Sequence, residues 1–235
     1  MGCILHIETS TNISSVAVSK DGFRVFDQVN HGDDKGSQAA EKLGSMVDEA
    51  MLALEAKQLK LEAVAVSAGP GSYTGLRIGT SMAKGIAYGS DAKLISIPTL
   101  QLLCVPVLLG DQELEDDALL CPMIDARRME VFAAIYDRAL GEVRPTQADI
   151  VDADTYRSIL DEHPVYFFGN GAEKCMSVIN HPNAHYITGI EPLAINMMPL
   201  ADKRFNQQQF EDVAYYTPTY FKDYQAKLPK NLLVK

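Results

Sequence analysis

The first residues of the chain alternate apolar and polar positions in the manner of β-strands. An apolar run begins at Cys3 and meets a polar turn at residues 9–12. A second run, rich in β-branched residues, ends at Asp21 and Gly22, a pair typical of tight turns. The pattern predicts two strands joined by a short turn.

The period then changes to that of a helix. Apolar side chains recur on one helical face through residues 37–55. A short apolar strand, residues 62–68, runs into a glycine-rich loop and a second helix, residues 74–88. A further strand is closed by Pro98. The first half is therefore predicted to form a hairpin, a helix, a strand, a glycine loop, a helix and a strand.

A similar order returns in the second half of the chain. The stretch "ALLCPMIDARRMEVFAAIYDRALGE" predicts a strand, a charged turn and a second strand, and "PVYFFGNGAEKCMSVI" predicts a strand, a Gly-x-Gly loop and a helix. This repetition indicates an internal duplication, although any mixed α/β chain can contain such units. The acidic, proline-containing residues 106–117 are the predicted linker, which divides the chain into residues 1–105 and 106–235.

Composition and charge narrow the class of protein. The 235 residues, 47% hydrophobic and 22% charged, suit one large or two small globular domains. A formal net charge of −10 makes the chain a poor candidate for gripping nucleic acid by itself. Four widely spaced cysteines without a C-x-x-C pair predict reduced, mostly buried thiols. No signal-peptide pattern and no apolar run near the roughly 20 residues of a membrane span are present, so we expect a cytoplasmic location and no membrane partner.

The glycine loop is suited to binding anions. Gly69 and Gly71 let backbone N–H groups converge, and Ser72 stands at the positive end of the following helix. The spacing, however, matches neither the Walker A pattern nor the Rossmann fingerprint. At the end of the first strand, Glu8, Thr9 and Ser10 could contact metal or phosphate, but a simple capped hairpin turn is the favoured explanation.

The helix after the loop carries small residues at every fourth position. Such a stripe lets another backbone approach closely, and apolar side chains flank it. From spacing alone, we expect this helix to lie flat on the chain's own sheet. One sheet face nevertheless cannot bury all the side chains of a helix that is apolar over most of its circumference, so one side of this helix could contact another protein. The stripe is Gly75, Gly79, Ala83 and Ala87, and its flanks are Leu76, Ile78, Met82 and Ile86.

Convergent catalytic groups are not evident. His181 and His185 are four residues apart, but Pro182 between them predicts a loop, so no metal site is expected. In the turn "DARRMEV", the guanidinium group of Arg127 could bind a carboxylate or phosphate through two hydrogen bonds. An internal ion-pair network among the four charges of this turn would explain it as well. We therefore expect no catalytic residue and no resident cofactor.

Four stretches resemble the TsaB (YeaZ) family: "ILHIETSTNISSVAV", "VAVSAGPGSYTGLRIGTSMAKGIA", "IPTL" and "MIDARRMEVF". The tail "PTYFKDYQAKLPK" resembles the closing segment of the same family. The resemblance implies two tandem RNase H-like domains of the actin-like ATPase or hexokinase-like fold, with mixed sheets flanked by helices. It agrees with the duplication predicted from the order of elements.

The resemblance also implies a function. TsaB proteins are non-catalytic platforms in the bacterial complex that adds threonylcarbamoyl to adenosine 37 of tRNAs reading codons that start with A. The implied partners are the catalytic TsaD subunit and the ATPase TsaE, with tRNA reached only through the complex, ATP held only at the level of the complex, and a homodimer when the chain is alone. The implied partner surface comes from the two N-terminal helices, with Leu43 and Val47 on the first and Gly75, Leu76, Ile78, Gly79, Met82, Ala83 and Ile86 on the second.

An enzyme of the ATPase or small-molecule kinase type is the alternative. It would bind nucleotide between the domains through Glu8 and the glycine loops. The six residues assigned to a vestigial phosphate site are Glu8, Thr9, Ser10, Gly69, Gly71 and Ser72.

Overall fold

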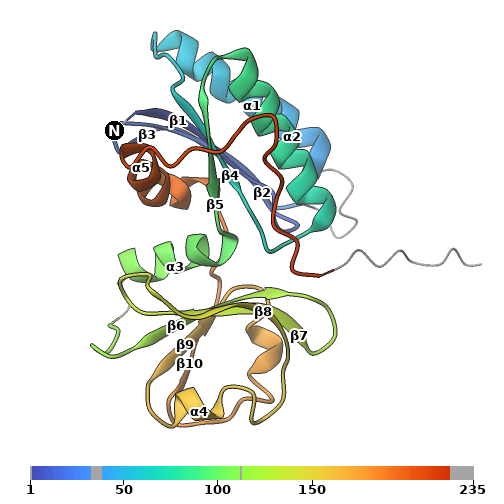
Figure 1. The fold of residues 1–235 in the computed structure, drawn as a ribbon, viewed down its shortest axis with the longest axis vertical. Coiled ribbons are helices and arrows are strands. Elements are labelled where there is room, and N and C mark those ends of the chain that lie inside the picture. Colours follow the sequence, from blue (N-terminus) through green and yellow to red (C-terminus); the bar gives the residue numbers. More distant parts are fainter. Residues whose placement is uncertain (1, 33–38, 112, 223–235) are drawn as a thin grey trace, which may run out of the picture.

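The first sheet contains five strands that the alternating pattern largely predicts. The computed structural model describes residues 2–32, 39–111 and 113–222 (Figure 1). The central strand β1 pairs antiparallel with β2 and parallel with β4. The sheet order is β3-β2-β1-β4-β5, with β1 at Cys3–Glu8, β2 at Ser14–Lys20, β3 at Phe23–Asn30, β4 at Ala63–Ser67 and β5 at Lys93–Ile97.

Two helices cover one face of this sheet. They are α1 (Ala39–Ala56) and α2 (Tyr73–Gly89), close to the predicted helices, although residue 37, where the first was expected to begin, lies outside the described residues. Val64 and Val66 of β4 point into the core beneath them, while Ala63 and Ala65 point to the opposite face. Successive strand side chains alternate between faces, so a strand buried on both sides is apolar throughout.

The second sheet repeats the topology of the first. Its order β10-β9-β6-β7-β8 places β6 at the centre, antiparallel to β7 and parallel to β9, as β1 is to β2 and β4. This correspondence confirms the predicted repetition and the α/β class with two mixed sheets flanked by helices. The strands are β6 at Leu119–Asp125, β7 at Glu130–Tyr136, β8 at Glu142–Ile150, β9 at Val165–Phe168 and β10 at Ala184–Ile187.

Helix α3 (Thr99–Leu109) lies between the two sheets in Figure 1. Leu102 packs with the core of the first sheet, whereas Leu103 and Val107 pack with that of the second. The predicted linker was therefore too long, because residues 106–109 are the last turn of α3, and the boundary expected after residue 105 falls inside this helix.

The chain after β10 returns to the first sheet. The short helix η2 (Ala194–Met197) and helix α5 (Met198–Asn206) cover the face opposite α1 and α2. The Ala194 N–H donates to Ser15 Oγ at 2.8 Å, and the Glu211 N–H donates to the Leu94 carbonyl at 2.9 Å. Residues 194–216 therefore complete the core of the first half of the chain.

Some expectations for the second half need correction. The helix predicted after the second glycine loop is only the 3₁₀ turn η1 (Glu173–Cys175), because the chain turns back before Pro182 into β10. The second half also contains a short helix, α4 (Arg157–Leu160). All four cysteines are free and buried, as predicted. Among the described residues, no helix combines the length and apolar character that a membrane crossing requires.

Candidate functional site

The glycine loop follows directly from β4 and begins α2. Gly69 has a φ of +98°, and a Cβ there would lie 2.7 Å from the Thr219 carbonyl oxygen. Both features require glycine, because other residues rarely adopt this backbone conformation. Ser72 caps the helix, its Oγ accepting the Gly75 N–H at 3.2 Å. The loop is thus shaped for close backbone contact.

The backbone that approaches the loop is the chain's own hairpin turn. The Ser72 N–H donates to the Ser10 carbonyl at 2.6 Å, and Thr9 Oγ1 donates to the Gly75 carbonyl at 2.8 Å. A Cβ on Gly71 would lie 2.4 Å from the Ser10 oxygen, and one on Gly75 would lie 2.0 Å from the Thr9 oxygen. The residues predicted for a phosphate site therefore do come together, but two carbonyl oxygens face the loop where an anion would need donors.

Glu8 is buried at the centre of this junction. Its Oε1 accepts the Ser10 N–H at 2.5 Å, and its Oε2 has no hydrogen-bond partner within the part of the chain that the structure describes. Burial removes the carboxylate from water and raises the pKa of Glu8 to about 7. Hydrogen bonds to neighbouring groups act in the opposite direction but are outweighed. The side chain is therefore a costly buried acid that no described cation compensates.

Gly75 and Gly85 provide a direct test of this packing. Both are inside α2, but a Cβ on Gly85 would have no neighbour within 4 Å. Gly75→Ala is expected to lower the free energy of unfolding by about 1–3 kcal/mol through overpacking against Thr9. Gly85→Ala is expected to raise it by up to about 1 kcal/mol, since alanine is the better helix former. Guanidinium denaturation measures both, and equal stability of the two variants would contradict the close approach.

The residues predicted to bind a partner fall into two groups. Five are buried within the chain: Leu43 and Val47 on α1, and Leu76, Gly79 and Ala83 on α2. In the chain alone these five offer no exposed surface: Leu43, Val47 and Ala83 pack in the core beneath the helices, Gly79 lies against Thr9, and Leu76 is 1% exposed. Gly75 is half-buried against the same turn. The half-buried apolar side chains left on α2 are Ile78, Met82 and Ile86.

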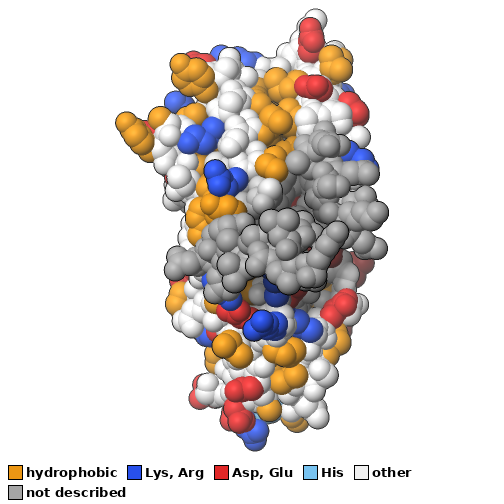
Figure 2. Space-filling view, turned by 90° about the vertical axis from the view of Figure 1, so that its right-hand side faces the viewer, with side chains coloured by type: hydrophobic (Ala, Val, Ile, Leu, Met, Phe, Trp, Pro, Cys, Tyr) orange, Lys and Arg blue, Asp and Glu red, His pale blue; other side chains and the backbone are white. Residues whose placement is uncertain are grey.

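Helix α1 adds residues that the sequence-based list missed. Leu52 is 62% exposed, and Met51 is half-buried beside it. Both contribute to a groove of about 610 Å³ that extends to Leu59 and Ser90. Figure 2 looks onto this side of the molecule and shows hydrophobic side chains in a band over its upper half. The sequence could have identified Leu52, because this apolar residue lies outside the periodic apolar positions that form the buried face of its helix. We call Ile78, Met82, Ile86, Met51 and Leu52 the helical face.

The two histidines singled out in the sequence contact different residues. His181 Nε2 is 3.2 Å from Asp161 Oδ1, whereas the His185 ring stacks on Tyr166 at 4.8 Å between centroids. Within the described ranges, no group of three His, Cys, Asp or Glu side chains is placed to hold a metal ion.

Comparisons with known proteins extend these observations. The family model for TsaD, the tRNA N6-adenosine threonylcarbamoyltransferase, matches residues 36–229. The tRNA threonylcarbamoyladenosine biosynthesis protein TsaB of Bacillus subtilis is 27% identical over 172 residues, which is 71% of this chain and 70% of that protein. The Escherichia coli protein of the same name is 32% identical over 136 residues, 57% of this chain and 55% of that protein. The aligned region thus spans about half the length of the second relative.

Solved structures show the same architecture. YeaZ from Pseudomonas aeruginosa superimposes with a TM-score of 0.73 over 94% of this chain and 100% of that chain, at 19% identity. A second Pseudomonas aeruginosa structure, an uncharacterised protein similar to the peptidase YEAZ, gives a TM-score of 0.79 with the same coverage and identity. At this identity, the likeness establishes the fold alone.

Proposed function

The chain belongs to the TsaD family, and within it to the TsaB/YeaZ proteins, and we propose that it is a non-catalytic platform in the synthesis of threonylcarbamoyladenosine in tRNA. It pairs with a TsaD-type subunit, which carries out transfer of threonylcarbamoyl to adenosine 37 of tRNAs that read codons starting with A, and this pair recruits a TsaE-type ATPase. The proposed compartment is the cytoplasm, which the four free, buried cysteines support.

The observation that carries the proposal is the contrast between the closed loop and the helical face. The loop that an actin-like enzyme would use for phosphate is occupied by the Thr9 and Ser10 carbonyls. The helical face instead leaves apolar side chains half-exposed over two adjacent helices, with the adaptable Met82 among them. Such a surface favours protein binding over small-molecule chemistry. We expect no nucleotide in the loop of the isolated chain and place any ATP at the level of the complex.

Met82→Glu tests the pairing. A carboxylate at the centre of an apolar interface loses its hydration without gaining a partner, so the affinity for the TsaD-type subunit is expected to fall by about 30-fold or more. Size-exclusion chromatography with light scattering, supported by calorimetry, measures the complex. Ala83→Arg is a poorer test because Ala83 is fully buried and the variant would strain the fold.

Val143→Glu is the matched control, since Val143 is 53% exposed on the second sheet. It should bind as the wild type does. Equal affinities for Met82→Glu and Val143→Glu would place the interface elsewhere. Absence of any complex, together with nucleotide hydrolysis by the isolated chain, would favour the enzyme alternative. A dimer of the chain alone that Met82→Glu disrupts would mean that the same face pairs with itself.

A further inference from the structure

The turn between β6 and β7 presents two arginines whose side chains have no partner among the described residues. Arg127 and Arg128 are both exposed and adopt left-handed backbone conformations, with φ of 72° and 51°. The turn is held by its own backbone, since the Glu130 N–H donates to the Arg127 carbonyl at 3.1 Å and the Arg127 N–H donates to Asp125 Oδ1 at 3.0 Å. The predicted ion-pair network within this turn is therefore not what orders it.

The acids of the turn are paired with lysines from elsewhere in the chain. Lys174 contacts Asp125 and also donates to the Glu130 carbonyl at 2.7 Å. Lys222, from the returning tail, donates to Glu130 Oε2 at 2.5 Å. Because the carboxylates are engaged in this way, the two guanidinium groups remain available to an external anion.

Aromatic rings continue this surface toward the first sheet. Phe221 packs on Phe132 of β7 at 6.4 Å between centroids, and its neighbour Tyr220 packs on Tyr73 of α2 at 5.0 Å. Arg77 lies over the Tyr73 ring, 5.3 Å from its centroid. Tyr73, Tyr220 and Phe221 each keep about a third or more of their area exposed.

The result is a continuous strip with an unusual charge. The turn and the side chains that contact this surface supply five cations and two acids, in a chain whose formal net charge is −10. Figure 2 shows Lys and Arg side chains gathered near the middle of this face, with acidic side chains on either side and hydrophobic ones below. We call the strip the basic–aromatic strip. Its cations are Arg77, Arg127, Arg128, Lys174 and Lys222, and its acids are Asp125 and Glu130.

We propose that the basic–aromatic strip binds single-stranded nucleic acid, with phosphates on Arg127 and Arg128 and bases against Tyr220 and Phe221. Each guanidinium group can donate two hydrogen bonds to a phosphate, and an exposed ring stacks on any base. An acidic peptide would use the arginines but would gain little from the rings. This inference rests on side chains outside the helical face, and it departs from the expectations that the chain is a poor binder of nucleic acid by itself and reaches tRNA only through the complex.

The test uses the full chain and a fluorescent oligouridylate of about 12 nucleotides, at about 50 mM salt. The double variant Arg127→Asn/Arg128→Asn removes both charges while keeping a residue type that tolerates left-handed backbone. Fluorescence anisotropy is expected to show an affinity loss of about tenfold or more, and the slope of log K against log salt should become shallower by about 1.4. The charge-matched control Arg24→Asn/Arg157→Asn should change the affinity by less than about twofold.

A second variant distinguishes nucleic acid from an acidic protein. Tyr220→Ala is expected to weaken oligouridylate binding by about fivefold or more, without changing the binding of a polyglutamate peptide of similar charge. Failure of the wild type to bind oligouridylate would overturn the proposal. So would equal losses in the two arginine double variants. Polyglutamate binding as tight as that of RNA, with no effect of Tyr220→Ala, would assign the strip to an acidic protein instead.

Discussion

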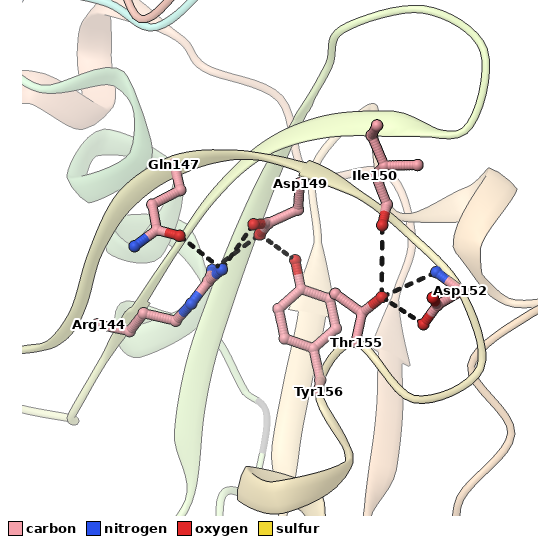
Figure 3. Close-up of polar contacts among 7 residues, drawn as sticks. All are labelled: Arg144, Gln147, Asp149, Ile150, Asp152, Thr155 and Tyr156. Carbon is pink, nitrogen blue, oxygen red and sulfur yellow. Dashed lines mark hydrogen bonds and ion pairs between the residues drawn. The ribbon is translucent and has the colours of Figure 1, made fainter.

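Asp149→Ala is expected to lower the free energy of unfolding by about 3–5 kcal/mol. Asp149 is only 7% exposed, and its carboxylate accepts two hydrogen bonds from Arg144, at 2.8 and 2.6 Å (Figure 3). Tyr156 donates a third hydrogen bond to it at 2.7 Å. Removing the carboxylate leaves the guanidinium and the hydroxyl without their acceptor, in a site closed to most water.

The position of this cluster in the sheet explains why its loss should matter. Arg144 and Asp149 are both on β8, the edge strand of the second sheet, and Tyr156 follows β8 in the chain. The Tyr156 ring packs on Phe167 of β9 at 5.4 Å between centroids, and Arg144 lies 5.6 Å from the centre of the same ring. The cluster therefore fastens the edge strand to the core.

Two matched variants separate the buried pair from a general effect of charge. Tyr156→Phe removes one hydrogen bond and should cost about 1 kcal/mol. Asp154→Ala removes an acid whose ion pair with Arg157 is exposed, and should cost less than about 0.5 kcal/mol. Urea unfolding at pH 7, followed by circular dichroism, compares the three variants. A loss in Asp149→Ala no larger than that in Asp154→Ala would show that the cluster contributes little.

Glu8→Gln is expected to stabilise the protein above neutral pH. The folded state holds the pKa of Glu8 at about 7, above the ordinary value of 4.5. Between these pH values, the unfolded carboxyl has lost its proton while the folded one keeps it, so the wild type loses stability as pH rises through this window. The loss is complete above pH 7 and amounts to about 3 kcal/mol. Glutamine carries no proton to lose and keeps an oxygen for the Ser10 N–H.

The quantity to measure is the difference in unfolding free energy between Glu8→Gln and the wild type across this pH range. It should grow between pH 4.5 and pH 7 toward about 3 kcal/mol in favour of the variant and level off at higher pH, because in this window the unfolded wild-type carboxyl ionises while the folded one keeps its proton. Glu142→Gln, on the exposed surface of β8, is the control and should show no such growth. A difference that stays constant with pH would mean that Glu8 is not a desolvated acid in the folded state.

The local pattern predicted more of the fold than of the site. Alternating runs located β1, β2 and β4, and helical periodicity located α1 and α2 to within a few residues. The second glycine loop was located too, but the helix expected after it is a single 3₁₀ turn. Periodicity describes which side of an element is apolar, whereas the length of an element also depends on where the chain must go next.

The small-residue helix illustrates the limit most clearly. The spacing of Gly75, Gly79 and Ala83 predicted correctly that another backbone comes close to α2. The spacing did not identify that backbone, which at Gly75 belongs to the chain's own hairpin turn. The resemblance to a known family instead led us to expect that the small residues contact a partner protein. The half-exposed residues of the helical face became distinguishable from the buried ones only when burial was known.

The sequence alone determined the α/β class, the repeated order of elements, the reduced cysteines and the family, because each is written in residue type and spacing along the chain. Only the tertiary structure decided that the hairpin turn closes the glycine loop, that residues 194–216 cover the first sheet, and that the Arg127 side chain has no described partner while Asp125 and Glu130 are paired. Each of these depends on contacts between segments far apart in the sequence, and no local period records such contacts.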